Sequence, residues 1–123
     1  MREAIRQMAL APARLTADSG DQSFCFTDSF HGFDGHFPGY PILPAILQTL
    51  LAQILAEQVV GEPLQFLSLK RAKFIRQLRP GDRIDVSLSF QEKDGQLHCA
   101  TQLRVANESA SKFTLVLAKG ALL

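Results

Sequence analysis

The segment after Pro44 constrains the fold of this chain more than any other part of it. Apolar residues occur there in adjacent pairs that repeat every four positions: Ile46 and Leu47, Leu50 and Leu51, Ile54 and Leu55. This spacing is typical of an α-helix with a wide buried face. The pattern predicts a central helix over residues 45–60 that ends near Gly61. A helix this apolar needs other elements to cover it.

Segments in which apolar and polar residues alternate follow this helix, as in the run from Ile84 to Gln91. With the turn sequences Pro80-Gly81-Asp82 and Lys93-Asp94-Gly95, the alternation predicts strands over residues 66–78, 84–91, 97–105 and 112–119. A short amphipathic helix within residues 1–12 and a hairpin over residues 14–27 are expected first. The sequence therefore predicts an α+β fold, in which an antiparallel sheet wraps around the central helix within one domain, residues 1–123.

Composition narrows the possible partners. The chain has 13 basic and 12 acidic residues and a formal net charge of +1, so it lacks an overall electrostatic footprint for nucleic acid or a membrane surface. The charged N-terminal segment and the absence of a sustained apolar run favour a cytoplasmic protein. Cys25 and Cys99 lack the spacing of metal ligands and are interpreted as buried free thiols. We expect no metal and no cofactor.

A stiff loop before the central helix carries the candidate catalytic base. Prolines 38, 41 and 44 restrict the backbone around it, so His36 is presented at little further entropic cost. A neutral imidazole is well matched to proton abstraction near pH 7. The other two histidines, His31 and His98, are interpreted as surface or satisfied core residues.

The start of the helix offers a second chemical feature. With Pro44 in the first turn, the amides of Ala45 and the next residues lack intrahelical acceptors. Directed at a thioester carbonyl, they would stabilise the enolate that forms when a base removes the adjacent α-proton. An ordinary solvated helix start is the alternative.

Two segments resemble the β-hydroxyacyl-acyl-carrier-protein dehydratases. These are His36-Phe37-Pro38-Gly39-x-Pro41-Ile42-x-Pro44 with the later Ala52-Gln53, and Ala72-Lys73-Phe74-x-Arg76-x-Leu78-x-Pro80-Gly81-Asp82. The resemblance implies a hot-dog fold, assembled as a homodimer or a higher oligomer, with His36 as base and the Ala45 amide polarising the thioester. It also implies an acyl pocket formed by Phe37, Pro38, Gly39, Pro44, Thr49, Leu50 and Gln53.

One departure concerns the catalytic acid. The family carries Glu or Asp on the helix fourteen residues after the histidine, where this chain has Leu50, or Thr49 if one residue is deleted. A positioned acid accelerates such eliminations roughly 10²–10⁴-fold. Asp34 is a candidate substitute, although a turn-stabilising role is the alternative. Gln53 and Glu57 lie further along the helix, and Glu57 is better interpreted as a solvated residue. Ala45 also replaces the family's glycine at the helix start.

Five basic residues lie close together in the second segment: Lys70, Arg71, Lys73, Arg76 and Arg79. They could dock an acidic acyl carrier protein, or they could be lysines and arginines of a solvated strand edge.

Three functions remain open. The first is a dehydratase-like enzyme acting on 3-hydroxyacyl thioesters of acyl carrier protein, or of coenzyme A, in fatty-acid or related lipid or polyketide biosynthesis. The second is a hot-dog thioesterase, which needs no acid for a leaving hydroxide. The third is a non-catalytic subunit that binds acyl groups or acyl carrier protein.

Overall fold

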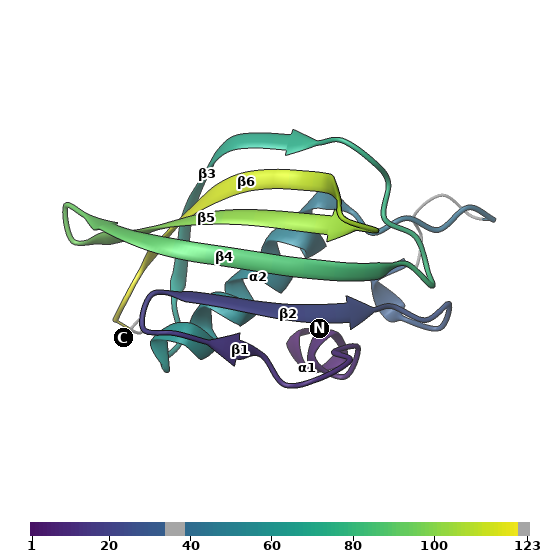
Figure 1. The fold of residues 1–123 in the computed structure, drawn as a ribbon, viewed down its shortest axis with the longest axis horizontal. Helices are drawn as coiled ribbons and strands as arrows, with labels where there is room; N and C mark the ends of the chain where they lie inside the picture. The colour runs from purple at the N-terminus through teal and green to yellow at the C-terminus, as the bar shows by residue number, and fades with distance from the viewer. Residues whose placement is uncertain (34–38, 121–123) are drawn as a thin grey trace.

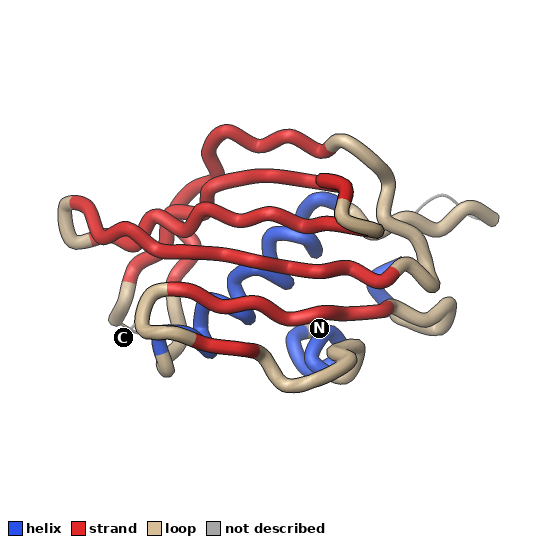
Figure 2. Tube along the Cα trace, viewed as in Figure 1, coloured by secondary structure: helices blue, strands red, loops and turns tan. Residues whose placement is uncertain are grey.

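The structure is a computed structural model that describes residues 1–33 and 39–120 (Figures 1 and 2). In chain order, the elements are α1 (Arg2–Arg6), β1 (Arg14–Leu15), β2 (Ser19–Cys25), the 3₁₀ turn η1 (His31–Phe33), α2 (Ala45–Val60), β3 (Gln65–Phe74), β4 (Arg83–Lys93), β5 (Gln96–Val105) and β6 (Glu108–Ala118). The central helix begins and ends at the residues that its apolar pattern predicts, and Gly61 ends it in a left-handed conformation.

The described residues form one six-stranded antiparallel sheet in the order β1-β2-β4-β5-β6-β3. Its hairpins follow local turn chemistry. Between β4 and β5, Asp94 and Gly95 both have positive φ, at 53° and 76°, as a two-residue hairpin loop requires. The strand β3 returns from α2 to the far edge of the sheet and pairs with β6.

The sheet curves over α2, which lies behind it in Figure 1. Five α2 residues are almost fully buried: Leu51, Ala52, Ile54, Leu55 and Ala56. They pack against the inward side chains of the strands, for example Ile84, Val86, Leu103 and Leu115. This confirms the predicted α+β hot-dog arrangement of an antiparallel sheet wrapped around one apolar helix.

The N-terminal helix is shorter than the sequence predicts. It covers Arg2–Arg6 rather than most of residues 1–12. The chain after it joins the sheet instead: the Cys25 amide donates to Met8 O at 3.0 Å, and the Leu10 amide donates to Ser23 O at 2.9 Å. Hydrogen bonds to β2 therefore replace the helical bonds that the amphipathic pattern indicates.

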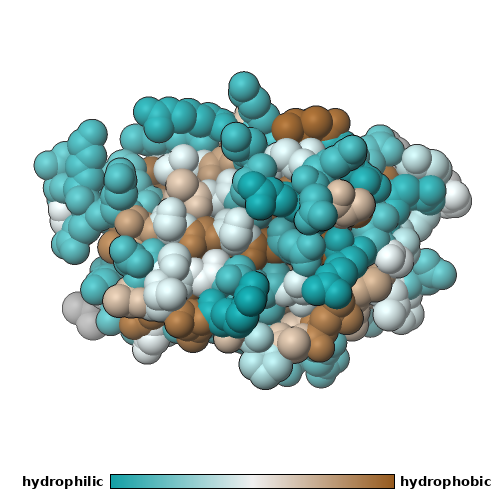
Figure 3. Space-filling view, in the orientation of Figure 1, coloured by the Kyte–Doolittle hydropathy of each residue, from teal (hydrophilic) through white to brown (hydrophobic). Residues whose placement is uncertain are grey.

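The outer face of the sheet is mainly hydrophilic, with pale and brown patches near its middle (Figure 3). Within the described ranges, no helix is both long and apolar enough to cross a membrane.

Candidate functional site

The start of α2 presents two amides, those of Ala45 and Ile46, that have no acceptor among the described residues. Pro44 precedes the helix with φ −69° and ψ 156°, and its carbonyl accepts hydrogen bonds from the amides of Leu47 and Gln48. No acceptor among the described residues receives a hydrogen bond from the amides of Ala45 or Ile46. Because these two donors lie at the positive end of a sixteen-residue helix, they favour a partial negative charge.

An apolar groove of about 700 Å³ opens beside this helix start. The helix supplies one wall and β3 supplies the other. Its lining residues are Met1, Ala45, Ile46, Leu47, Thr49, Leu50, Gln53, Phe66 and Leu69. The structure thus brings together four residues that the sequence assigns to the site, Ala45, Thr49, Leu50 and Gln53. The sequence analysis did not assign Met1 or the β3 residues Phe66 and Leu69 to the site. The pattern of Phe66 and Leu69 is that of ordinary strand residues and gives no sign of a groove.

The described side chains that line this groove include no carboxylate. Thr49 Oγ1 donates to the Ile46 carbonyl at 2.8 Å, and Gln53 Nε2 donates to the Leu64 carbonyl at 2.9 Å. Leu50 adds only hydrocarbon. The helix positions considered for an acid therefore supply a hydroxyl and an amide, neither of which is a strong proton donor.

Glu57 has a structural role instead of the solvated position expected for it. Its side chain is only 12% exposed, and its carboxylate pairs with the Arg2 guanidinium and accepts the Leu64 amide at 2.9 Å. It thereby ties α1 and the chain after α2 to the helix. It does not line the groove.

An aromatic cluster holds the chain ahead of the histidine loop. The rings of Phe26 and Phe30 lie 4.6 Å apart, and those of Phe30 and Phe33 lie 5.6 Å apart in an edge-to-face arrangement. Gly32 lets this turn approach α2, because a Cβ there would overlap Phe30 Cε2 and Leu47 Cδ1. The first flank of the loop is thus packed on the first turn of α2.

The second flank is tied to the segment after β3. The Leu43 amide donates to the Leu78 carbonyl at 2.7 Å. Arg79 stacks over the Tyr40 ring at 3.7 Å and donates from Nε to the Pro41 carbonyl at 3.4 Å. Gly39 is exposed and has φ 80°, and Pro44 is half-buried. The four predicted site residues between the flanks, Asp34, His36, Phe37 and Pro38, lie outside the described residues.

The five basic residues do not form one patch. Arg76 pairs with Asp82 at 3.5 Å, and Arg79 contacts Tyr40, so both lie near the start of α2. Lys70 and Arg71 instead line a cavity on the outer face of the sheet, and Lys73 is exposed on β3. The sequence places these residues near one another along the chain, but β3 ends at Phe74, so Arg76 and Arg79 lie beyond the strand that carries the other three.

The remaining candidates have structural surroundings. Cys99 is fully buried, and this burial raises the pKa of its thiol to about 11, although its hydrogen bond with Thr101 acts in the opposite direction. Cys25 is half-buried rather than buried, and both thiols are free. Among the residues that the structure describes, no three His, Cys, Asp or Glu side chains are placed to hold a metal ion.

Known proteins are similar to this chain in sequence and in fold. The enzyme named 3-hydroxyacyl-acyl-carrier-protein dehydratase FabZ from Thermotoga petrophila is 37% identical over 91 residues, which cover 69% of this chain and 66% of the relative. FabZ from Syntrophobacter fumaroxidans is 35% identical over 71 residues, covering 51% of this chain and 48% of the relative. The chain thus spans about half the length of the first curated relatives it matches.

A solved structure, the dehydratase heterocomplex ApeI:P from Xenorhabdus doucetiae, has the same fold. It superposes with a TM-score of 0.75 at 22% identity, covering 90% of this chain and 96% of that chain. The model of the ApeI-like dehydratase family matches residues 13–113, which begin just before β1 and end within β6. With a match of that extent, and with the helix start and groove that it encloses, the chain belongs to the ApeI-like dehydratase family.

Proposed function

We propose that this chain dehydrates 3-hydroxyacyl thioesters carried by acyl carrier protein, in fatty-acid or related lipid or polyketide biosynthesis. One observation carries the proposal: an apolar groove of about 700 Å³ opens at the amides of Ala45 and Ile46, which have no acceptor among the described residues, in a chain of a dehydratase family. A groove of this volume suits a small acyl group, and the adjacent amides suit the carbonyl at its head.

In the proposed reaction, His36 removes a proton from the carbon next to the thioester carbonyl. The electrons of that C–H bond move onto the carbonyl oxygen, where the Ala45 amide stabilises the negative charge. They then form the double bond as the C–O bond of the hydroxyl breaks. The hydroxyl leaves as water after accepting one proton, so the products are an unsaturated thioester and water.

The departing hydroxyl needs a proton donor in order to leave as water. Among the residues that the structure describes, no carboxylate lines the groove. Asp34, two residues before His36, is the candidate that the chain itself supplies. The carrier protein would dock near Arg76 and Arg79, because both guanidinium groups lie beside the segment that leads into α2.

The test is hydration of a crotonyl thioester, offered on acyl carrier protein and on coenzyme A, with loss of the conjugated double bond followed by absorbance. His36→Ala should lower kcat/KM by at least about 100-fold, the scale of general-base catalysis. His31→Ala removes a histidine of η1, five residues earlier in the chain, and is the matched control. Full activity in His36→Ala would remove the imidazole from the mechanism. Release of free thiol, with no change at the double bond, would identify a thioesterase instead.

A second function is an acyl-binding subunit that works beside an acid-bearing dehydratase. It is favoured because no carboxylate lies among the described residues that line the groove. The similarity to a chain of a dehydratase heterocomplex supports the same idea. Leu50→Glu and Thr49→Glu each place an acid at a family position. A gain of dehydration in either variant would show a site that lacks only its donor. Acyl binding without turnover in all variants would select the binding subunit.

We also propose that a second copy of the chain covers the groove. The strand β3 pairs with β6 on one side only, and several large apolar side chains near it are exposed, including Ile46 at 74%, Phe66 at 45% and Ile75 at 58%. An open strand edge beside exposed apolar residues is a pairing surface. Two-fold pairing would close both grooves at once.

A further inference from the structure

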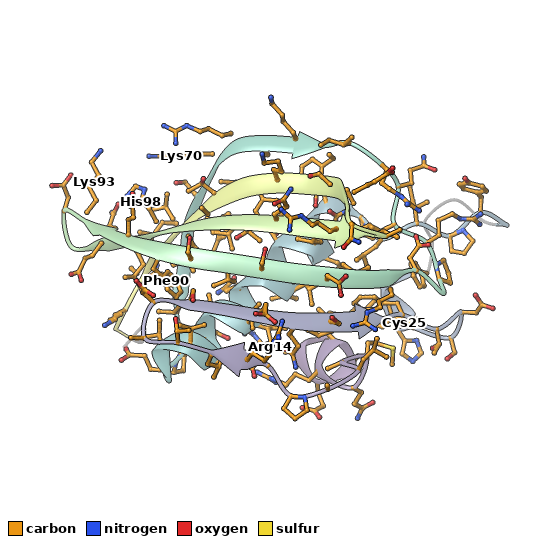
Figure 4. The ribbon with its side chains drawn as sticks, in the orientation of Figure 1. Arg14, Cys25, Lys70, Phe90, Lys93 and His98 are labelled. Atoms are coloured by element: carbon orange, nitrogen blue, oxygen red, sulfur yellow. The ribbon has the colours of Figure 1, made fainter. Side chains whose placement is uncertain are left out.

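A second cavity, of about 760 Å³, lies on the outer face of the sheet, at the end that carries the β4–β5 hairpin. Lys70 from β3, Lys93 from the end of β4 and His98 from β5 gather there (Figure 4). The groove beside α2 lies on the inner face and shares no lining residue with this cavity. The outer cavity is therefore a separate place on the molecule.

The charge of this outer cavity is unbalanced. Lys70, Arg71 and Lys93 line it together with His98, and Glu92 is its single acidic lining residue. Within the described part of the chain, the ion pairs join other residues, such as Arg76 with Asp82 and Arg83 with Asp85. The three cations of the cavity thus have no carboxylate partner among the described residues. Such a concentration of unneutralised positive charge attracts an anion.

The backbone of β3 is distorted so that two consecutive cations reach the same cavity. Lys70 pairs with Thr114 and Lys73 pairs with Lys112, so Arg71 and Ala72 together oppose one residue of β6. In a regular strand, successive side chains point to opposite faces, which would turn Arg71 toward the inner face. A bulge re-aims a side chain, and Arg71 sits in it at φ 52°. A left-handed conformation is strained for arginine and persists only where the surroundings impose it.

The cations of the outer cavity do more than protect the edge of β3 from pairing with another strand. Lysines on an edge strand discourage unwanted pairing, which explains the exposed Lys70 and Lys73. It does not explain why Lys93 and His98, from two interior strands, line the same hollow. It also does not explain a strained arginine beside an adjacent lysine.

We propose that the outer cavity binds the phosphate or diphosphate group of a small phosphorylated ligand. The guanidinium of Arg71 offers a planar pair of donors that matches two phosphate oxygens, while Lys70 and Lys93 act as point charges. The hydroxyls of Ser89 and Thr114 also line the cavity and can donate hydrogen bonds. The hollow shape favours a small ligand over a flat acidic protein surface, and its volume lies in the range of small-molecule sites.

The test titrates inorganic phosphate and pyrophosphate into the full chain by calorimetry, with backbone NMR shifts to locate the site. Pyrophosphate should bind saturably and shift the amides around Lys70, Lys93 and His98. Arg71→Gln and Lys93→Gln should each weaken pyrophosphate binding by at least about tenfold, the scale of losing charge-assisted hydrogen bonds. Lys73→Gln removes the same charge from the same strand outside the cavity, and should change the dissociation constant less than about twofold.

Arg71→Gly separates binding from folding. Glycine adopts φ 52° without strain, so this variant should keep or raise the melting temperature while it loses pyrophosphate affinity. The proposal is overturned if no saturable pyrophosphate binding occurs, or if Lys73→Gln weakens it as much as Arg71→Gln does. Binding of an acidic protein at these residues without pyrophosphate binding would overturn it in favour of a docking surface. Dehydratase activity plays no part in these outcomes, so failure here leaves the proposed reaction untouched.

Discussion

The carboxylate of Glu57 joins three parts of the chain, since Arg2 and the Leu64 amide both donate to it from outside α2. Glu57→Gln keeps an acceptor oxygen but removes the charge. We expect a loss of about 1–2 kcal/mol in the free energy of unfolding, measured by urea denaturation, because a charge-assisted, half-buried bond is weakened. The kcat/KM for thioester hydration should stay within about twofold of the native value.

The exposed Glu62→Gln is the control for this change and should leave both stability and activity as they are. A large loss of activity in Glu57→Gln with native stability would reinstate Glu57 as the missing acid.

Cys99 makes stability depend on pH in the alkaline range. Burial raises its thiol pKa from 9.0 to about 11, so the folded state binds the proton more tightly than the unfolded state does. This contribution is fully present below pH 9 and is lost as pH rises toward 11, by on the order of 2–3 kcal/mol. We expect Cys99→Ala to be less stable than the native chain at pH 8 and to lose less stability between pH 8 and 10.5.

Urea unfolding at the two pH values measures this difference, because other groups titrate alike in both proteins. Equal losses in the two proteins would mean that the thiol does not titrate as its burial requires.

At the residue scale, the sequence predicts the position of a side chain when that position depends on its neighbours along the chain. Ala45 lies at the helix start because Pro44 and the apolar period define that start. Thr49, Leu50 and Gln53 share one face because helical spacing puts them there. The partner of Glu57 could not be found in this way, since Arg2 is 55 residues distant in sequence. Local pattern contains no information about such a pair.

At the element scale, η1 approaches α2 closely at Gly32. Gly32→Ala introduces a methyl group that overlaps the Phe30 ring and the Leu47 side chain, and the buried aromatic cluster gives Phe30 little room to move. We expect a loss of about 1–3 kcal/mol in stability, the scale of overpacking in a core. Because Leu47 also lines the groove, KM for acyl substrates should rise.

Thermal denaturation and acyl-thioester kinetics measure the two effects of Gly32→Ala together. Gly95→Ala, which has open space around its Cβ but φ 76°, is the comparison: it should lose stability with no change in KM. A Gly32→Ala protein with native stability and native KM would show that this turn does not support the groove.

Elements with a clear hydrophobic period could be predicted from the sequence. Elements whose ends or irregularities depend on hydrogen bonds to another strand could not. The alternation from Ile84 to Gln91 and the Asp94-Gly95 turn indicate β4 and its hairpin correctly. The short helix that the sequence predicts within residues 1–12 ends at Arg6, and the carbonyl of Met8 accepts a hydrogen bond from β2 instead. The bulge at Arg71 has no local signature, since it exists only in relation to the register of β6.

At the scale of the whole molecule, the proposed second copy would cover the β3 edge and the apolar residues around it. Leu67→Lys with Ile75→Lys places two charges among these exposed side chains, outside the groove lining. We expect the native chain to sediment as a dimer and the double variant to shift toward monomer by at least about tenfold in dissociation constant, because charges in a pairing surface are costly to desolvate.

Ala106→Lys with Asn107→Lys, in the exposed turn between β5 and β6, adds the same two charges. This double variant is the matched control and should leave the dimer intact. A native chain that sediments as a monomer at all concentrations would contradict the proposed pairing.

The wrapped architecture could be predicted because the apolar helix has no other element to cover it. The strand order could not, because alternation tells which residues face inward but not which strands are neighbours. The placement of β3 beside β6 determines both the second wall of the groove and the outer cavity. The sequence pattern alone therefore could not place Phe66 and Leu69 in the groove or Lys93 in the outer cavity.

The strand order has a consequence for how the polypeptide is made. The strand β3 leaves the ribosome before β4 and β5, yet its partner β6 is the last of the described strands to be synthesised. During translation, the apolar residues of β3 therefore wait without a neighbour until the chain has been extended past Ala118. A nascent chain stalled between β5 and β6 should bind chaperones strongly, and release should coincide with emergence of the last strand.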